Sequence, residues 1–298
     1  MNITGTDNAN QNGAQNATAA PPGVAWQTRK PEIHVTAALA PQKTSTAEGG
    51  TSLVIPALNE ARNITWVLEQ IPDCVDEVLL VDGASRDATL LMARRCMPKV
   101  RVVAQQGPGK GNALRTGFRE AVGENIVMMD ADGSMSPQEI PRFLHFLDNG
   151  YDFVKGSRFV AGGGSLDLTP LRRLGNLALV SSVRALYHTT LTDLCYGYCA
   201  FHRCFLDHLD LRSDGFEIET EMVLHALQAG LRIAEVPSLE LPRRSGRSNL
   251  RTFRDGARVL RTVLGERDAT RRDVATRGAV VREGSWSRPD PDGASCEA

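Results

Sequence analysis

The sequence predicts an α/β protein whose sheet is mostly parallel and is covered by helices on both faces. Three observations support this fold class. Continuous runs of aliphatic and β-branched residues recur along the middle of the chain, as in strands that are buried on both sides. Segments with apolar residues at helical spacing separate these runs. The links between the two kinds of segment are short, which favours parallel strands joined by packed helices.

The apolar runs predict four buried strands, at residues 52–55, 77–81, 100–104 and 126–129. Helical spacing predicts three helices, marked by Ile64, Val67, Leu68 and Ile71, by Ala113, Leu114, Phe118 and Ala121, and by Ile140, Phe143, Leu144 and Leu147. We expect Ser136 to cap the last of these helices, with Pro137 at its first position and Glu139 closing a capping box.

The two ends of the chain differ from its middle. Residues 1–50 and 266–298 lack a sustained apolar period, so we expect disordered tails around one folded domain at 51–265. The formal net charge of −1 points to no particular partner. No run reaches the roughly 18 apolar residues that span a bilayer, and no basic-then-apolar segment opens the chain. With six cysteines that form no disulfide framework, we expect a cytoplasmic protein.

Polar loops follow all four predicted strands, at residues 56–60, 82–87, 105–111 and 130–134. The carboxyl ends of parallel strands meet at one edge of a sheet, and ligands bind outside that edge. We therefore expect these loops to form one binding site.

The sharpest pair of residues in these loops is Asp130 and Asp132. In extended backbone, residues two apart project to the same side, so both carboxylates can converge on one ion. Carboxylate oxygens suit Mg²⁺ or Mn²⁺, which keep positions open for phosphate oxygens.

Lys110 lies in a glycine-rich loop and could meet a phosphate. That loop is neither a Walker A loop nor a GxGxxG fingerprint, because its glycines have the wrong spacing and follow the third strand.

In the order of these motifs the chain resembles glycosyltransferase family 2, whose domain has the Rossmann-like GT-A fold. The resemblance rests on the ordered segments VIPALNE, VDGASRDAT, GPGKGNALRTGF, VMMDADGS and KGSRF. The later segments LTDLCYGY, DGFEIETEM and RRSGRSNL are similar to the branch of polyprenyl- and dolichyl-phosphate mannosyl- and glucosyltransferases. The resemblance covers about residues 51–265.

The resemblance implies roles for particular side chains. Those holding the nucleoside would be Pro56, Ala57, Glu60 and Asp82, with Asp82 facing the base and Glu60 the ribose. Lys110 would lie near the base and phosphates, while Asp130 and Asp132 would place the metal on the diphosphate. Arg158 and Arg243 would bind the diphosphate or an acceptor phosphate. Two residues depart from the family pattern, namely Gly83, where many relatives have a second aspartate, and Ser134, where mannose synthases often have glutamine.

Four further acids have an open role. Asp193, in LTDLCYGY, could orient the acceptor, act as a general base, or be a structural hydrogen-bond partner. For Glu217, Glu219 and Glu221 a place in the site and a structural role are both open.

The expected activity is inverting transfer of a hexose from a UDP- or GDP-sugar to an acceptor, with a polyprenyl phosphate at the membrane surface as the leading candidate. A soluble hydroxyl acceptor and a non-catalytic nucleotide-sugar-binding domain are the alternatives.

Two segments, a helix beginning near residue 249 and the stretch 171–191, combine arginines with apolar residues. Such helices either lie on the inner face of the cell membrane or pack on the core with a solvated back. The folded region has no nucleic-acid recognition module, so we expect no nucleic-acid partner.

Overall fold

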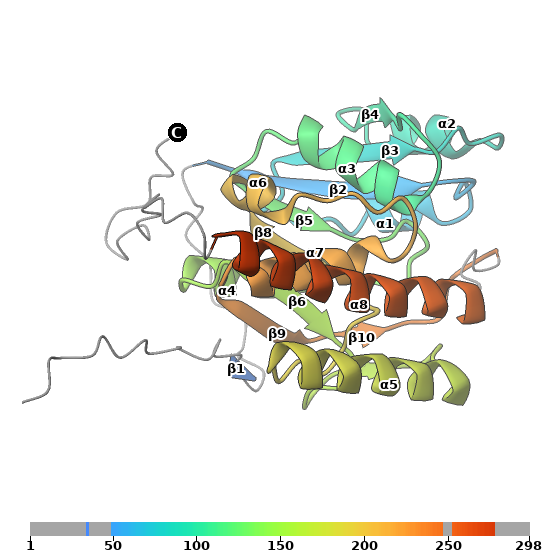
Figure 1. The fold of residues 1–298 in the computed structure, drawn as a ribbon. Helices are drawn as coiled ribbons and strands as arrows, with labels where there is room; N and C mark the ends of the chain where they lie inside the picture. Colours follow the sequence, from blue (N-terminus) through green and yellow to red (C-terminus); the bar gives the residue numbers. More distant parts are fainter. Residues whose placement is uncertain (1–33, 36–48, 247–251, 278–298) are drawn as a thin grey trace, which may run out of the picture.

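The computed structural model describes residues 34–35, 49–246 and 252–277, and its centre is a single large sheet (Figure 1). The strand order is β1-β9-β6-β8-β5-β2-β3-β4. The bounds are β1 His34–Val35, β2 Thr51–Ala57, β3 Glu77–Asp82, β4 Arg101–Ala104, β5 Asn125–Met128, β6 Phe153–Ser157, β8 Cys199–His202 and β9 Ile233–Pro237. All neighbouring strands are parallel except β8, which is antiparallel to both β5 and β6. The α/β class and the mostly parallel sheet are thus confirmed.

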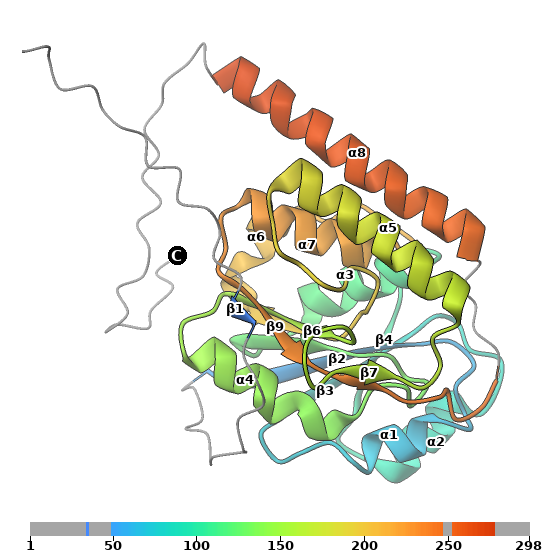
Figure 2. The same cartoon turned by 90° about the horizontal axis from the view of Figure 1, so that it is seen from below.

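Helices cover both faces of this sheet, as the sequence predicts (Figure 2). One face carries α1 (Ile64–Leu68), α2 (Thr89–Cys96) and α4 (Ile140–Asp148). The other carries α3 (Lys110–Glu120), α5 (Pro170–Tyr187), α6 (Leu206–Leu209), α7 (Ile218–Gln228) and α8 (Thr252–Arg277). Two short 3₁₀ turns, η1 (Pro137–Glu139) and η2 (Arg203–Phe205), precede α4 and α6. A separate two-stranded ladder joins β7 (Gly164–Ser165) to β10 (Leu239–Glu240).

The hydrophobic core is divided by the sheet into two clusters. In β2, Val54 points into the cluster under α3 and α7, while Leu53 and Ile55 point into the cluster under α1 and α4. Successive side chains of a strand project to opposite faces, so a strand buried on both sides must be apolar throughout. This explains why the predicted strands are continuous apolar runs.

Two expectations about local structure are corrected. Ser136 makes no side-chain cap, and Glu139 does not close a capping box. The Glu139 carboxylate instead accepts hydrogen bonds from the Ser238 hydroxyl and, at 3.1 Å, from the Leu239 amide. Donors brought in by the β9–β10 connection thus replace the local partner, which helical spacing alone could not reveal.

Two described elements extend beyond the range 51–265. The short strand β1 lies inside the segment 1–50 and pairs with β9. Helix α8 continues to Arg277, through charged turns in which no apolar period marks the helix. The remaining parts of the expected tails, 1–33, 36–48 and 278–298, and the expected helix start near residue 249 lie outside the described residues.

Candidate active site

A cavity of about 410 Å³ lies at the carboxyl ends of the central strands. Three of the four predicted loops line it, through residues such as Pro56, Ala57 and Glu60, then Lys110, and then Asp130 and Asp132. Helices α5, α7 and α8 complete the wall. The convergence of loops far apart in the sequence is what parallel strand ends predict.

The second predicted loop, 82–87, does not line this cavity. Asp82 ends β3 and is buried, and its carboxylate accepts a hydrogen bond from the Ser85 amide at 3.2 Å. This carboxylate closes its own turn, so Asp82 and its loop are absent from the cavity lining. The structure nevertheless places Asp82 beside Ala57, its partner in the β2–β3 register, so it lies next to the residues expected to hold the nucleoside without lining the cavity.

Lys110 joins two acids at the first turn of α3. Its ammonium lies 2.5 Å from Asp130 Oδ1 and 2.6 Å from Glu219 Oε1. Burial alone would lower the pKa of Lys110, but the two carboxylates outweigh it and raise the pKa above its ordinary value. Burial raises the pKa of Asp130 to about 6 against the opposing effect of Lys110, with Asp132 and Glu219 adding to the rise. Lys110 therefore remains a cation held between anions.

Steric crowding explains why glycines occur in the loop before α3. Gly109 has a φ of +95°, and a Cβ there would lie 2.1 Å from the Asp214 carbonyl oxygen. The neighbouring Gly111 amide donates to that same oxygen at 2.8 Å. A side chain would prevent this close approach of the two backbones. The glycines thus let the loop before α7 close over the start of α3.

Asp132 and Glu60 are joined by a single arginine. Arg243 Nη2 lies 2.7 Å from Asp132 Oδ2, and its Nη1 lies 2.9 Å from Glu60 Oε1. The other oxygen of Asp132 accepts from the Ser134 amide at 2.9 Å. The structure therefore brings together three predicted site residues from the first loop, the fourth loop and the segment after β10.

The charge of the lining fits a divalent cation. Seven carboxylates and four cationic side chains line the cavity, counted over the described part of the chain. An anionic diphosphate would be repelled by this excess of acid unless a cation offset it. Asp130 and Asp132 offer hard oxygen donors in this lining, which is the ligand type that Mg²⁺ and Mn²⁺ prefer.

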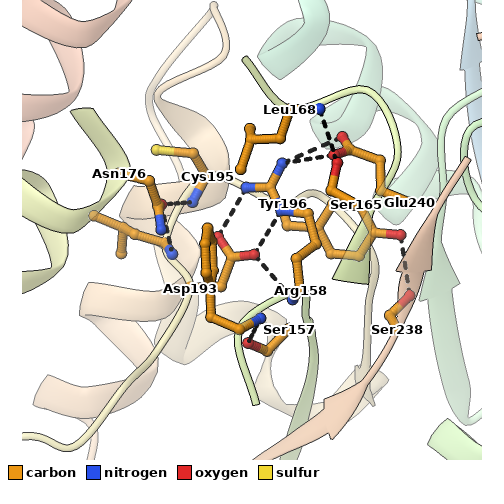
Figure 3. A network of polar contacts seen from close by, with 12 residues as sticks. Ser157, Arg158, Ser165, Leu168, Asn176, Asp193, Cys195, Tyr196, Ser238 and Glu240 are labelled. Atoms are coloured by element: carbon orange, nitrogen blue, oxygen red, sulfur yellow. Dashed lines mark hydrogen bonds and ion pairs between the residues drawn. The ribbon is translucent and has the colours of Figure 1, made fainter. Parts of the chain in front are cut away.

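Arg158 follows β6 and lines the cavity, and the carboxylates of Asp193 and Glu240 hold its guanidinium in place (Figure 3). Its Nε and Nη2 donate to the two carboxylate oxygens of Asp193 at 2.7 and 2.9 Å. Its Nη1 lies 3.2 Å from Glu240, and its guanidinium lies 4.9 Å from the centre of the Tyr196 ring. Burial would lower the pKa of Arg158, but Asp193 and Glu240 raise it above its ordinary value.

Asp193 itself is fully buried and does not line the cavity. Besides Arg158, it is fixed by its own amide, which donates to Glu235 Oε1 at 3.0 Å. Of the open roles, contact with an acceptor would require Asp193 to leave Arg158. This geometry matches that of a residue acting through Arg158.

Sequence reasoning assigned no firm role to several acids and amides of the lining, among them Glu219, Glu240 and Asn176. For Glu219 the sequence left a place in the site open, and the structure puts it in the lining, paired with Lys110. Its neighbours have structural roles: Glu221 accepts from the Ser213 amide at 2.9 Å, and Glu217 from the Gly215 amide at 3.3 Å. Glu240 and Asn176 carried no local signal, since only the tertiary fold brings them to the cavity.

The sheet, the polar strand ends and the acid pair define a glycosyltransferase with the GT-A fold. The chain belongs to glycosyltransferase family 2, because the model of that family (Glycosyl transferase family 2) matches residues 52–209.

Known proteins similar to this chain support that assignment. It is 35% identical to Glycosyltransferase AglJ of Haloferax volcanii, over 68% of this chain and 67% of that protein. It is 34% identical to the undecaprenyl-phosphate mannosyltransferase of Micrococcus luteus, over 66% of this chain and 86% of the relative. In structure it resembles glucosyl-3-phosphoglycerate synthase from Mycobacterium tuberculosis, solved with Mn²⁺, UDP and glucosyl-3-phosphoglycerate. The TM-score is 0.61 at 24% identity, covering 74% of this chain and 81% of that one, which is a likeness of fold.

Proposed function

We propose that this glycosyltransferase moves a hexose, with inversion, from a UDP- or GDP-sugar to a polyprenyl phosphate at the inner surface of the membrane. One observation carries the proposal. The cavity that contains Asp130 and Asp132 extends to α5 and α8, and both helices expose large apolar side chains elsewhere on their surfaces. A site between a metal-binding acid pair and two such helices suits an acceptor that is charged at one end and apolar along its length.

The donor half of the site would use the strand-end residues. Pro56, Ala57 and Glu60 would hold the nucleoside, and Lys110 would lie beside the phosphates. A Mg²⁺ or Mn²⁺ ion held by Asp130 and Asp132 would neutralise charge on the departing diphosphate. The mycobacterial synthase was solved in complex with Mn²⁺ and UDP, which supports this assignment.

The acceptor half would depend on arginine. A phosphate monoester already carries about −1.5 to −2 charges near neutrality, so its attack needs no general base. It needs fixed cations, and a guanidinium presents parallel N–H donors that match phosphate oxygens. Arg158, whose Nε and Nη2 are held by Asp193, would present its Nη1 to a phosphate by exchanging its contact with Glu240. Arg243 would exchange its contacts with Glu60 and Asp132 for a phosphate.

Contact with the membrane is part of the proposal. Large exposed apolar residues lie on α5 and α8, namely Leu171, Leu174, Leu177, Phe253, Leu260 and Leu264. Arginines on the same helices would favour anionic headgroups. Among the described helices, none is both long and apolar enough to cross a bilayer.

The activity test uses the purified chain with labelled UDP- and GDP-sugars and Mn²⁺. Each donor is paired with undecaprenyl phosphate in detergent, with 3-phosphoglycerate, or with a soluble alcohol, and products are separated by chromatography. We expect transfer to the lipid phosphate. Transfer only to a soluble acceptor would replace the lipid assignment, and donor binding without turnover would identify a nucleotide-sugar-binding domain.

The membrane test is flotation with vesicles containing anionic lipid. We expect Phe253→Asp, at a side chain that is 80% exposed on α8, to weaken vesicle binding. Leu91→Asp is the matched control, because Leu91 is 53% exposed on α2, on the opposite face of the sheet. Equal vesicle binding of the parent and Phe253→Asp would contradict the proposed contact through α8.

A further inference from the structure

Helices α5 and α8 lie side by side (Figure 2), and both contribute residues to the lining of the cavity. Each contributes a glycine to the cavity lining, Gly175 from α5 and Gly256 from α8. A Cβ at either position would meet no atom within 4 Å, so both glycines border open space. Neither has a positive φ, so the backbone at these positions would accept any side chain. Because glycine is a poor helix former, local structure gives no reason for it at either position.

The lining of this space includes both apolar and charged side chains. Apolar side chains of Leu168, Leu179 and Val259 line the cavity; Leu179 lies about one helical turn after Gly175, and Val259 about one turn after Gly256. Arg158 and Arg172 also line the cavity. Asp167 and Asp255 line it as well, so the charge of this part is mixed. The apolar side chains suit a hydrocarbon chain, and the two arginines suit an anionic head group.

A second observation points to a ligand at this place. Thr220, on α7, lines the same cavity and is 1% exposed. Its hydroxyl has no hydrogen-bond partner within the described part of the chain. A buried hydroxyl without a partner is costly, and the polar end of a bound molecule, not its hydrocarbon chain, would satisfy it.

We propose that the space between α5 and α8 holds the hydrocarbon chain of the acceptor, and that Gly175 and Gly256 set its width. This assignment rests on the proposed function, because it takes the acceptor to be a polyprenyl phosphate. It makes the two glycines specificity-determining residues, although neither contacts the reacting atoms. The chain would leave the cavity toward the apolar residues exposed on the same helices.

The test fills the space with a side chain. Gly256→Leu and Gly175→Leu place a branched group where no atom lies within 4 Å of the Cβ, and leucine favours the helix. We therefore expect thermal stability to stay the same or rise. Gly265→Leu is the matched control, since Gly265 also lies on α8 beside open space but does not line the cavity.

The measurement is kcat/KM for undecaprenyl phosphate and for farnesyl phosphate, together with the rate of donor hydrolysis without acceptor. We expect Gly256→Leu to lower kcat/KM for the long acceptor by about tenfold or more, which is the scale of steric discrimination in apolar pockets. Transfer to the short acceptor and donor hydrolysis should change much less, and the Gly265→Leu control should match the parent.

The outcomes separate this inference from the proposed function. If the parent transfers sugar to neither lipid phosphate, the proposed function is wrong and the inference fails with it. If the parent uses undecaprenyl phosphate and both cavity variants keep the parent's preference for chain length, the assignment of this space is wrong while the function stands. An equal loss of transfer and hydrolysis in a variant would also overturn it, because the change would then act on the donor half.

Discussion

Replacing Asp193 with asparagine would show whether Asp193 positions Arg158 or acts as a general base, because the variant keeps the shape of the side chain and removes its charge. In the structure, the two Asp193 oxygens accept charge-assisted hydrogen bonds from Arg158 at 2.7 and 2.9 Å. Asparagine keeps only one acceptor oxygen and turns an N–H group toward the guanidinium. The substitution therefore leaves a buried arginine with an incomplete partner.

The size of the effect follows from the burial of this pair. Removing one member of a buried ion pair costs about 3–5 kcal/mol. Glu240 stays 3.2 Å from Arg158 and one hydrogen bond to residue 193 remains, so we expect the lower end, about 3 kcal/mol. A domain of this size loses about 2–4 °C of Tm for each kcal/mol, which predicts a fall of roughly 6–12 °C.

The assay combines thermal unfolding with kcat/KM for transfer at a temperature where the variant is folded. If Asp193 positions Arg158, we expect a clear loss of stability and a loss of activity of about tenfold, within the value of a charge-assisted contact. If Asp193 were a general base, activity would fall by about 10²–10⁴-fold. An unchanged Tm together with a loss of that size would refute the positioning role.

A double-mutant cycle with Arg158→Met checks the same reasoning independently. Two residues that act as a pair lose less stability when both are replaced than the sum of the single losses. Additive losses of stability would show that Arg158 and Asp193 are not energetically coupled, whatever their distance.

Three further predictions follow from other contacts of the site. Asp132→Asn should leave folding intact but abolish metal-dependent transfer, and wild-type rates over a Mn²⁺ titration, or full activity of the parent in EDTA, would contradict this. Lys110→Met should leave Asp130 and Glu219 facing each other without their cation, and so lower stability by about 3–5 kcal/mol in chemical denaturation; a loss below about 1 kcal/mol would mean that the buried pair is not needed. Burial raises the pKa of Glu235 to about 7 from an ordinary 4.5, so its contribution to folding stability is fully present below pH 4.5 and is lost as pH rises through 7, by at most roughly 3–4 kcal/mol. Glu235→Gln should remove that part of the pH dependence, and identical slopes for parent and variant between pH 4.5 and 7 would disprove it.

The sequence by itself determined the fold class and the place of the central site. Strand and helix periods are local properties, and the predicted strands and helices agree with β2, β3, β4, β5, α1, α3 and α4. Since parallel strand ends share one edge, the order of the loops alone brought Asp130, Asp132 and Lys110 to one place. In the structure all three line the same cavity, and the Lys110 ammonium lies 2.5 Å from Asp130.

Only the tertiary structure decided which partner each polar side chain takes. The antiparallel course of β8, the pairing of Arg158 with Asp193 and the bridge of Arg243 between Asp132 and Glu60 join segments far apart in the chain. Asp82 had the same local signal as the aspartates of the cavity, but its carboxylate turned to its own loop. A buried charge takes the partner that the packed chain brings within reach, and that partner has no local pattern. The open space beside Gly175 and Gly256 likewise arises only when two distant helices lie together.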